Sequence, residues 1–355
     1  RCLALPQKAR QPLFEREQGR ELKDQTSQKE YVMHIEVGDF HPELQHQVPR
    51  LRRMAKLMRV PGVIRIIDWL RRREGGSDVA GLDCSTVNIP SSLDNYSIRT
   101  RIYRPPNVSE PLPCLVYFHG GGYIMGVPEG SAELIKLFIQ TRPCVVVAPD
   151  YRKAHQKPFP GGFQDCYDAM IWARDNADAL ECSDKIIIGG HSAGGGLTAA
   201  VALKARDTGD VEVAFQMPFY PMIDDMQPTD PTRDIDPPVW DTALNAIGWG
   251  SYLRGVRGRG ETPSAYAAPA RADSLAGLPP TITYVGDKDP FYWETEAYVE
   301  GLRTAGIDVA HKVYEGCYHA FEYIGEGGAI GAQARAFTFE NFSLFYDRYV
   351  TGTST

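Results

Sequence analysis

Residues 185–194 read KIIIGGHSAG, and residues 197–200 read LTAA. Three consecutive isoleucines predict a buried strand, and the small and apolar residues that follow predict a helix. Between them, Gly190, Ser192 and Gly194 fit the pattern G-x-S-x-G of a nucleophile elbow, in which the glycines leave room for a tight, strained turn. The alternative is a turn rich in glycine and serine without a chemical role. Because the pattern stands between a strand and a helix, we expect Ser192 to project into a cleft.

Similar apolar runs recur on both sides of this stretch and alternate with amphipathic segments. Continuous apolar strands separated by helices are typical of an α/β fold whose mainly parallel sheet is buried on both faces. Two stretches with alternating polarity precede them and predict strands with one solvated face. The expected strands are 86–89, 98–103, 114–118, 144–148, 185–188, 213–217, 281–285 and 309–314, and the expected helices fall near 132–139, 165–177, 195–205, 294–305 and 332–349.

The composition of the 355 residues is ordinary for a globular protein, with 43% hydrophobic and 23% charged residues. It excludes wholesale disorder and collagen-like or coiled-coil architecture. A net charge of −7 argues against nucleic acid as a partner. The sequence contains no run of eighteen apolar residues and no recognisable signal peptide, so we expect a cytoplasmic protein without stable membrane insertion. Seven scattered cysteines without metal-ligand spacing predict reduced thiols and no metal site.

One segment departs from the acidic average. Residues 50–74 carry nine basic residues against two acidic ones, a net charge of +7. Their apolar positions recur at helical spacing and are interrupted by Pro61-Gly62, which predicts two short helices. A basic amphipathic helix can bind a membrane surface, but that function requires a continuous apolar face, which the Pro-Gly pair interrupts. We interpret the charges as a solvated helix face, with Leu57, Ile64, Ile67 and Leu70 packed over the cleft.

Polar residues follow several strands at the edge where ligands of such sheets bind. A serine nucleophile needs a base, and the base needs an acid that orients it. In the chain order Ser, acid, His, the base is His319, because His311 lies inside an apolar run. The acid is Asp287 or Asp289. We favour Asp289, which precedes Pro290 in the loop, and regard Asp287 as a carboxylate that caps the turn.

A second glycine-rich motif follows the third predicted strand, as His119-Gly120-Gly121-Gly122. Acyl transfer places negative charge on the carbonyl oxygen, and backbone amides of such a loop stabilise it together with the amide after the nucleophile. The expected donors are Gly121, Gly122 and Ala193. His119 is expected to hold the loop through hydrogen bonds, not to transfer protons.

These motifs together closely resemble those of the hormone-sensitive lipase family of α/β-hydrolase carboxylesterases. Further similarities are Asp150-Tyr151-Arg152 with Pro158-Phe159-Pro160, residues 266–271, and Leu278-Pro279-Pro280, so the resemblance extends from Leu112 to the C-terminus. It implies an α/β-hydrolase fold with a helical cap and an esterase that needs no cofactor. The sequence departs from the family pattern at His191, before the serine, at Tyr292-Trp293, where a charged pair is usual, and at Ala320, after the histidine.

From these observations we expect cap helices within residues 1–82 and a catalytic domain at 83–355, in which the insertion 224–265 contributes to the cap. The expected substrate is a small-molecule ester with a short or medium acyl chain. An amidase, a lactonase or a specialised natural-product esterase would use the same residues. A non-catalytic small-molecule receptor is the alternative from another class, although receptors on this scaffold typically lack the histidine. A monomer and a homodimer both remain open.

Overall fold

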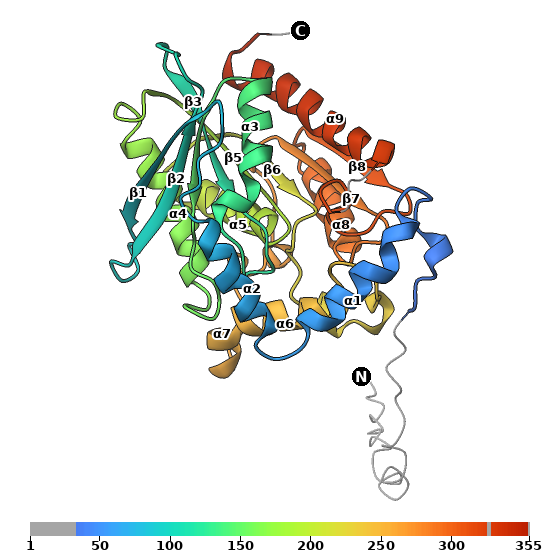
Figure 1. The fold of residues 1–355 in the computed structure, drawn as a ribbon. Coiled ribbons are helices and arrows are strands. Elements are labelled where there is room, and N and C mark those ends of the chain that lie inside the picture. Colours follow the sequence, from blue (N-terminus) through green and yellow to red (C-terminus); the bar gives the residue numbers. More distant parts are fainter. Residues whose placement is uncertain (1–32, 325–327, 354–355) are drawn as a thin grey trace, which may run out of the picture.

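The computed structural model describes residues 33–324 and 328–353. Its centre is one sheet of eight strands, and every predicted strand is present (Figure 1). The strands are β1 (Asp83–Pro90), β2 (Ser97–Arg104), β3 (Leu112–Phe118), β4 (Val145–Pro149), β5 (Cys182–His191), β6 (Val213–Phe219), β7 (Thr281–Gly286) and β8 (Val309–Tyr314). The order across the sheet is β1-β2-β4-β3-β5-β6-β7-β8, in which β2 is antiparallel to both neighbours and the strands from β4 to β8 are parallel.

Helices cover both faces of the sheet, as the continuous apolar strands require. On β3, Cys114 and Val116 belong to one buried cluster, while Leu115 and Tyr117 belong to the other. The first cluster includes apolar residues of α4 (Gly161–Asp175), α5 (Ala193–Thr208) and α8 (Tyr292–Thr304). The second includes α3 (Ala132–Thr141) and α9 (Gly328–Phe345), where Phe138 contacts the ring of Tyr117. The domain therefore has three layers, with the sheet in the middle.

Four further helices gather at one end of the sheet (Figure 1). They are α1 (Val48–Met58), α2 (Val63–Arg71), α6 (Thr242–Tyr252) and α7 (Arg254–Gly258). Gly62 adopts a φ of +88° between α1 and α2, so the Pro-Gly pair separates two helices as predicted. Asp241 begins α6, because its carboxylate accepts the amide of Leu244 at 2.9 Å.

Ion pairs attach α1 to the segment that leads into α6. Arg52 contacts the carboxylate of Asp236 at 3.3 Å, and Arg59 pairs with Asp241. Leu51 and Ala55 are the buried side of α1. The predicted packing of Leu57 and Leu70 over the cleft is wrong, since both side chains are exposed, while Ile64 and Ile67 are half-buried. Helical spacing shows which residues share a face, but it does not show which apolar face of such a helix packs.

The described cysteines form no disulfide, and all of them except Cys84 are buried. Cys2 lies outside the described residues. In the described part of the chain, no helix combines the length and the apolar character that crossing a bilayer requires.

Candidate active site

The turn from β5 into α5 places Ser192 at the carboxyl edge of the sheet. Ser192 has a φ of +58° and a ψ of −123°, a conformation that costs free energy in a residue with a side chain. The flanking glycines make it possible. A Cβ on Gly194 would lie 2.0 Å from the carbonyl oxygen of Phe118, and one on Gly190 would lie 2.5 Å from the same atom. The pattern G-x-S-x-G is therefore a steric requirement of this turn.

Three predicted residues meet at this edge and form one chain of hydrogen bonds. The Ser192 Oγ lies 2.9 Å from Nε2 of His319, and Nδ1 of His319 lies 2.7 Å from Oδ2 of Asp289. All three residues are at most 5% exposed. The other carboxylate oxygen of Asp289 accepts the amide of Phe291 at 2.9 Å. This arrangement can remove a proton from the serine and hold the imidazole in one orientation.

The two acidic candidates lie in different environments. Oδ1 of Asp287 accepts the amide of Gly316 at 2.6 Å, and Oδ2 contacts Lys288 at 3.1 Å. Asp287 thus joins the ends of β7 and β8, whereas Asp289 contacts His319. The structure thus brings Asp289, and not Asp287, to the histidine.

The ring of His319 is held by residues that the sequence did not reveal. Tyr220 and Phe291 approach it edge-on, each with a centroid distance of 5.0 Å. The hydroxyl of Tyr220 donates to Oε1 of Glu322 at 2.6 Å, and Tyr284 donates to the same oxygen at 2.8 Å. Burial raises the pKa of Glu322. These contacts join residues up to 102 positions apart, so no local motif could have shown them.

The loop after β3 lies beside the serine turn. Gly121 and Gly122 adopt φ values of +126° and +58°. Their amides and that of Ala193 donate to no acceptor within residues 33–324 and 328–353. The six-membered ring of Trp240, from the insertion, lies against Gly122, where a Cβ would be 2.2 Å from its Cη2 atom. Three backbone donors are thus left for a ligand at this edge.

His119 contacts the loop itself. Its Nδ1 lies 2.7 Å from the carbonyl oxygen of Gly120, and its ring stacks on Tyr151 with a centroid distance of 4.2 Å. The ammonium of Lys153 lies 3.1 Å from Nε2, so Nε2 is the acceptor and Nδ1 carries the proton. Burial, with the charge of Lys153, lowers the pKa of His119 well below its ordinary value. A neutral histidine in this position supports the expected role in holding the loop.

His191, the residue before the serine at which the sequence departs from the family pattern, also contacts the glycine-rich loop after β3. The amide of Gly120 donates to its Nε2 at 3.3 Å, and its Nδ1 lies 3.2 Å from the hydroxyl of Tyr117. A Cβ on Gly120 would lie 2.8 Å from Cδ2 of this ring, so the histidine fits only against glycine. Burial, and then the charge of His319, lowers the pKa of His191 to about 4. A neutral His191 can accept from Gly120, whereas a protonated one cannot.

This pKa predicts a pH-dependent stability. Between pH 6.5 and about 4 the unfolded chain protonates this residue and the folded chain does not, so stability falls as the pH falls. We expect His191→Gln to flatten the pH dependence of the free energy of unfolding by about 2 kcal/mol across that interval. Urea denaturation at pH 7 and pH 4.5 measures the difference. An unchanged slope would show that the folded chain does not lower the pKa of His191.

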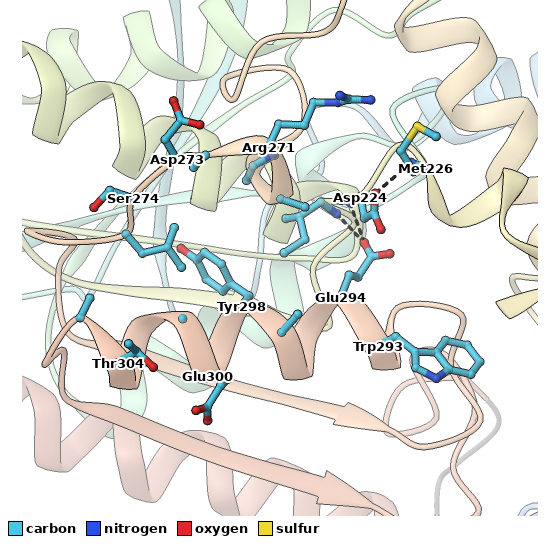
Figure 2. Close-up of a pocket in the computed structure, with 18 of the residues that line it drawn as sticks. Asp224, Met226, Arg271, Asp273, Ser274, Trp293, Glu294, Tyr298, Glu300 and Thr304 are labelled. Atoms are coloured by element: carbon cyan, nitrogen blue, oxygen red, sulfur yellow. Dashed lines mark hydrogen bonds between the residues drawn. The ribbon is translucent and has the colours of Figure 1, made fainter. Parts of the chain in front are cut away.

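A well-defined pocket lies elsewhere (Figure 2). It has a volume of about 770 Å³ and lies between α8 and residues 269–276. Ser192, Asp289 and His319 do not line it. Glu294 does, but its Oε1 accepts the amides of Ile223 and Asp224 at 2.6 and 3.1 Å, which fixes the chain after β6. The hydrogen-bonded chain at Ser192, and not this pocket, is therefore the candidate active site.

Comparisons with known proteins agree with the fold. Residues 115–323 match a family model described as alpha/beta hydrolase fold. Carboxylesterase NlhH of Mycobacterium tuberculosis is 33% identical over 216 residues, which cover 60% of this chain and 67% of that protein. Esterase LipI of the same organism is 31% identical over 245 residues, which cover 67% and 75%. A solved bacterial heroin esterase aligns with a TM-score of 0.78 at 29% identity, over 87% of this chain and 98% of that one.

The chain therefore belongs to the α/β-hydrolase family. Within it, the chain is an esterase of the hormone-sensitive lipase group, as the resemblance of its motifs implied.

Proposed function

We propose that this esterase hydrolyses carboxylic esters through Ser192, His319 and Asp289. The observation that carries the proposal is the unbroken hydrogen-bonded chain from Asp289 through His319 to Ser192. His319 takes the hydroxyl proton as Ser192 attacks the ester carbonyl, and Asp289 stabilises the imidazolium. His319 then gives the proton to the leaving alcohol, which departs as the acyl-enzyme forms. Water, deprotonated by His319, releases the acid and restores the serine.

The oxyanion of each tetrahedral intermediate requires donors, and we assign them to the amides of Gly121, Gly122 and Ala193. Support comes from their lack of acceptors among the described residues and from their place beside Ser192. One such donor typically contributes about 10²–10³-fold in turnover. His119 and His191 hold the loop through contacts with the carbonyl oxygen and the amide of Gly120.

The cap in this proposal consists of the helices within residues 1–82, as far as they are described, together with the insertion 224–265. Two contacts with the glycine-rich loop support it. Oδ1 of Asp68, on α2, accepts the amide of Gly126 at 3.2 Å, and Trp240 lies against Gly122. An indole at the oxyanion loop limits the space beside the reacting carbonyl, which favours short or medium acyl chains.

A chain-length series of p-nitrophenyl esters, with matched anilides and lactones, tests the substrate class. We expect the highest kcat/KM for a short or medium acyl ester, a decrease of at least about tenfold for long chains, and slow anilide turnover. Trp240→Ala should shift the optimum toward longer chains, because it removes the ring at Gly122. Faster turnover of anilides or lactones would assign the enzyme to one of those classes instead.

A further inference from the structure

The outer surface of α1 and α2, with the turn between them, exposes large apolar side chains. Six of them, each between 48% and 58% exposed, lie within seventeen residues: Met54, Leu57, Val60, Ile66, Trp69 and Leu70. Spacings of three and four residues put Met54 with Leu57, and Ile66 with Trp69 and Leu70, on common sides of their helices. Both helices belong to the group of helices at the lower end of the molecule in Figure 1. We call these six residues the α1–α2 face.

The cations around this face divide into two groups. Arg52 and Arg59 pair with Asp236 and Asp241 and attach α1 to the body. Arg72 pairs with Asp68 of α2 and also donates to Gln156 at 3.1 Å. Six others are exposed and form no ion pair with any described residue: Arg50, Arg53, Lys56, Arg65, Arg71 and Arg73. The guanidinium of Arg73 lies 3.9 Å above the ring of Trp69. Exposed cations are therefore interleaved with exposed apolar groups.

We propose that the α1–α2 face docks reversibly on an anionic lipid surface. Apolar side chains with tryptophan, bordered by lysine and arginine, are the features that bind helices in the plane of a membrane interface. Charge complementarity selects the anionic lipid, since this face carries six exposed cations without an ion pair among the described residues, while the whole chain carries −7. The acidic remainder is repelled by such a surface, which orients the molecule with this face toward the lipid. The proposal does not depend on which ester the enzyme hydrolyses.

The break at Pro61-Gly62 does not prevent this docking. It separates two helices that each expose apolar residues, and Val60, just before the break, is itself 49% exposed. The face is therefore carried by two short helices and the turn between them. Surface docking needs no element that spans the bilayer.

Flotation of the full chain with lipid vesicles tests the proposal. We expect it to bind vesicles that contain phosphatidylglycerol, to bind pure phosphatidylcholine at least about tenfold more weakly, and to dissociate as salt is raised. The triple variant Ile66→Ser/Trp69→Ser/Leu70→Ser should weaken binding by at least about tenfold. The double variant Arg53→Glu/Lys56→Glu should also weaken binding by at least about tenfold, because each cation near an anionic surface contributes about fivefold. Their thermal unfolding should match the parent protein, since the altered side chains are exposed.

Two control variants change exposed residues outside the α1–α2 face. Leu344→Ser on α9 removes an exposed apolar side chain, and Arg303→Glu on α8 reverses an exposed positive charge. Both should bind vesicles like the parent. The proposal is wrong if the parent does not prefer anionic vesicles, or if the triple variant binds them as well as the parent. It is also wrong if the face joins two copies of the chain instead. In that case sedimentation would show that the parent is a dimer and the triple variant a monomer, and the parent would not bind vesicles.

Discussion

Ser192→Ala should lower kcat for a p-nitrophenyl ester on the order of 10⁵-fold, with KM changed far less. The hydroxyl removed is the atom 2.9 Å from Nε2 of His319, and no other residue replaces it in the chain of hydrogen bonds. The variant should fold normally, because alanine adopts this turn no worse than serine. Steady-state kinetics on purified protein measures the effect.

Ser183→Ala is a matched control, since it removes a serine hydroxyl at the start of the same strand. It should retain the activity of the parent. If Ser192→Ala keeps more than a small fraction of the activity while Ser183→Ala behaves as expected, the nucleophile is another group.

Asp289→Asn should lower kcat on the order of 10³–10⁴-fold. An amide at this position no longer stabilises the imidazolium, and it can present its NH₂ group to Nδ1 of His319, which favours the wrong tautomer. The matched variant is Asp287→Asn, which changes the same chemical group two residues away. Because Asp287 contacts Gly316 and Lys288 and not His319, its variant should keep turnover within a fewfold of the parent. Equal losses in the two variants would remove the distinction between the acids.

The eight strands could be predicted because each is a run of apolar or alternating residues, and that pattern is local. The turn at Ser192 could be predicted for a similar reason, since its glycines are required by contacts within a strand–turn–helix unit and with the neighbouring Phe118. His319 and Asp289 followed from chain order and from their places after strands. The number of residues that separates them from Ser192 does not determine how far apart they lie in space, so the distances between the three side chains could be known only from the structure.

The surroundings of the site could not be predicted in this way. Glu322 meets Tyr220 and Tyr284 from distant parts of the chain, and nothing in a local pattern indicates which acid will be buried among tyrosines. His191 was recognised as a departure, but its contact with Gly120 depends on how β3 and β5 pair. The exposure of Leu57 and Leu70 was missed because both helices are apolar on more than one side. In each case the prediction would have required knowledge of how distant parts of the chain pack together.

Covalent labelling by a fluorophosphonate tests the central claim most directly. The reagent forms a stable bond only with a serine whose proton is removed by a neighbouring base and whose oxyanion is stabilised. We predict one adduct per chain by intact-mass measurement, located on the peptide that contains Ser192, with complete loss of esterase activity. Labelling should disappear in Ser192→Ala and be strongly slowed in Asp289→Asn. An active enzyme that remains unlabelled, or an adduct on another residue, would contradict the assignment of Ser192 as the nucleophile.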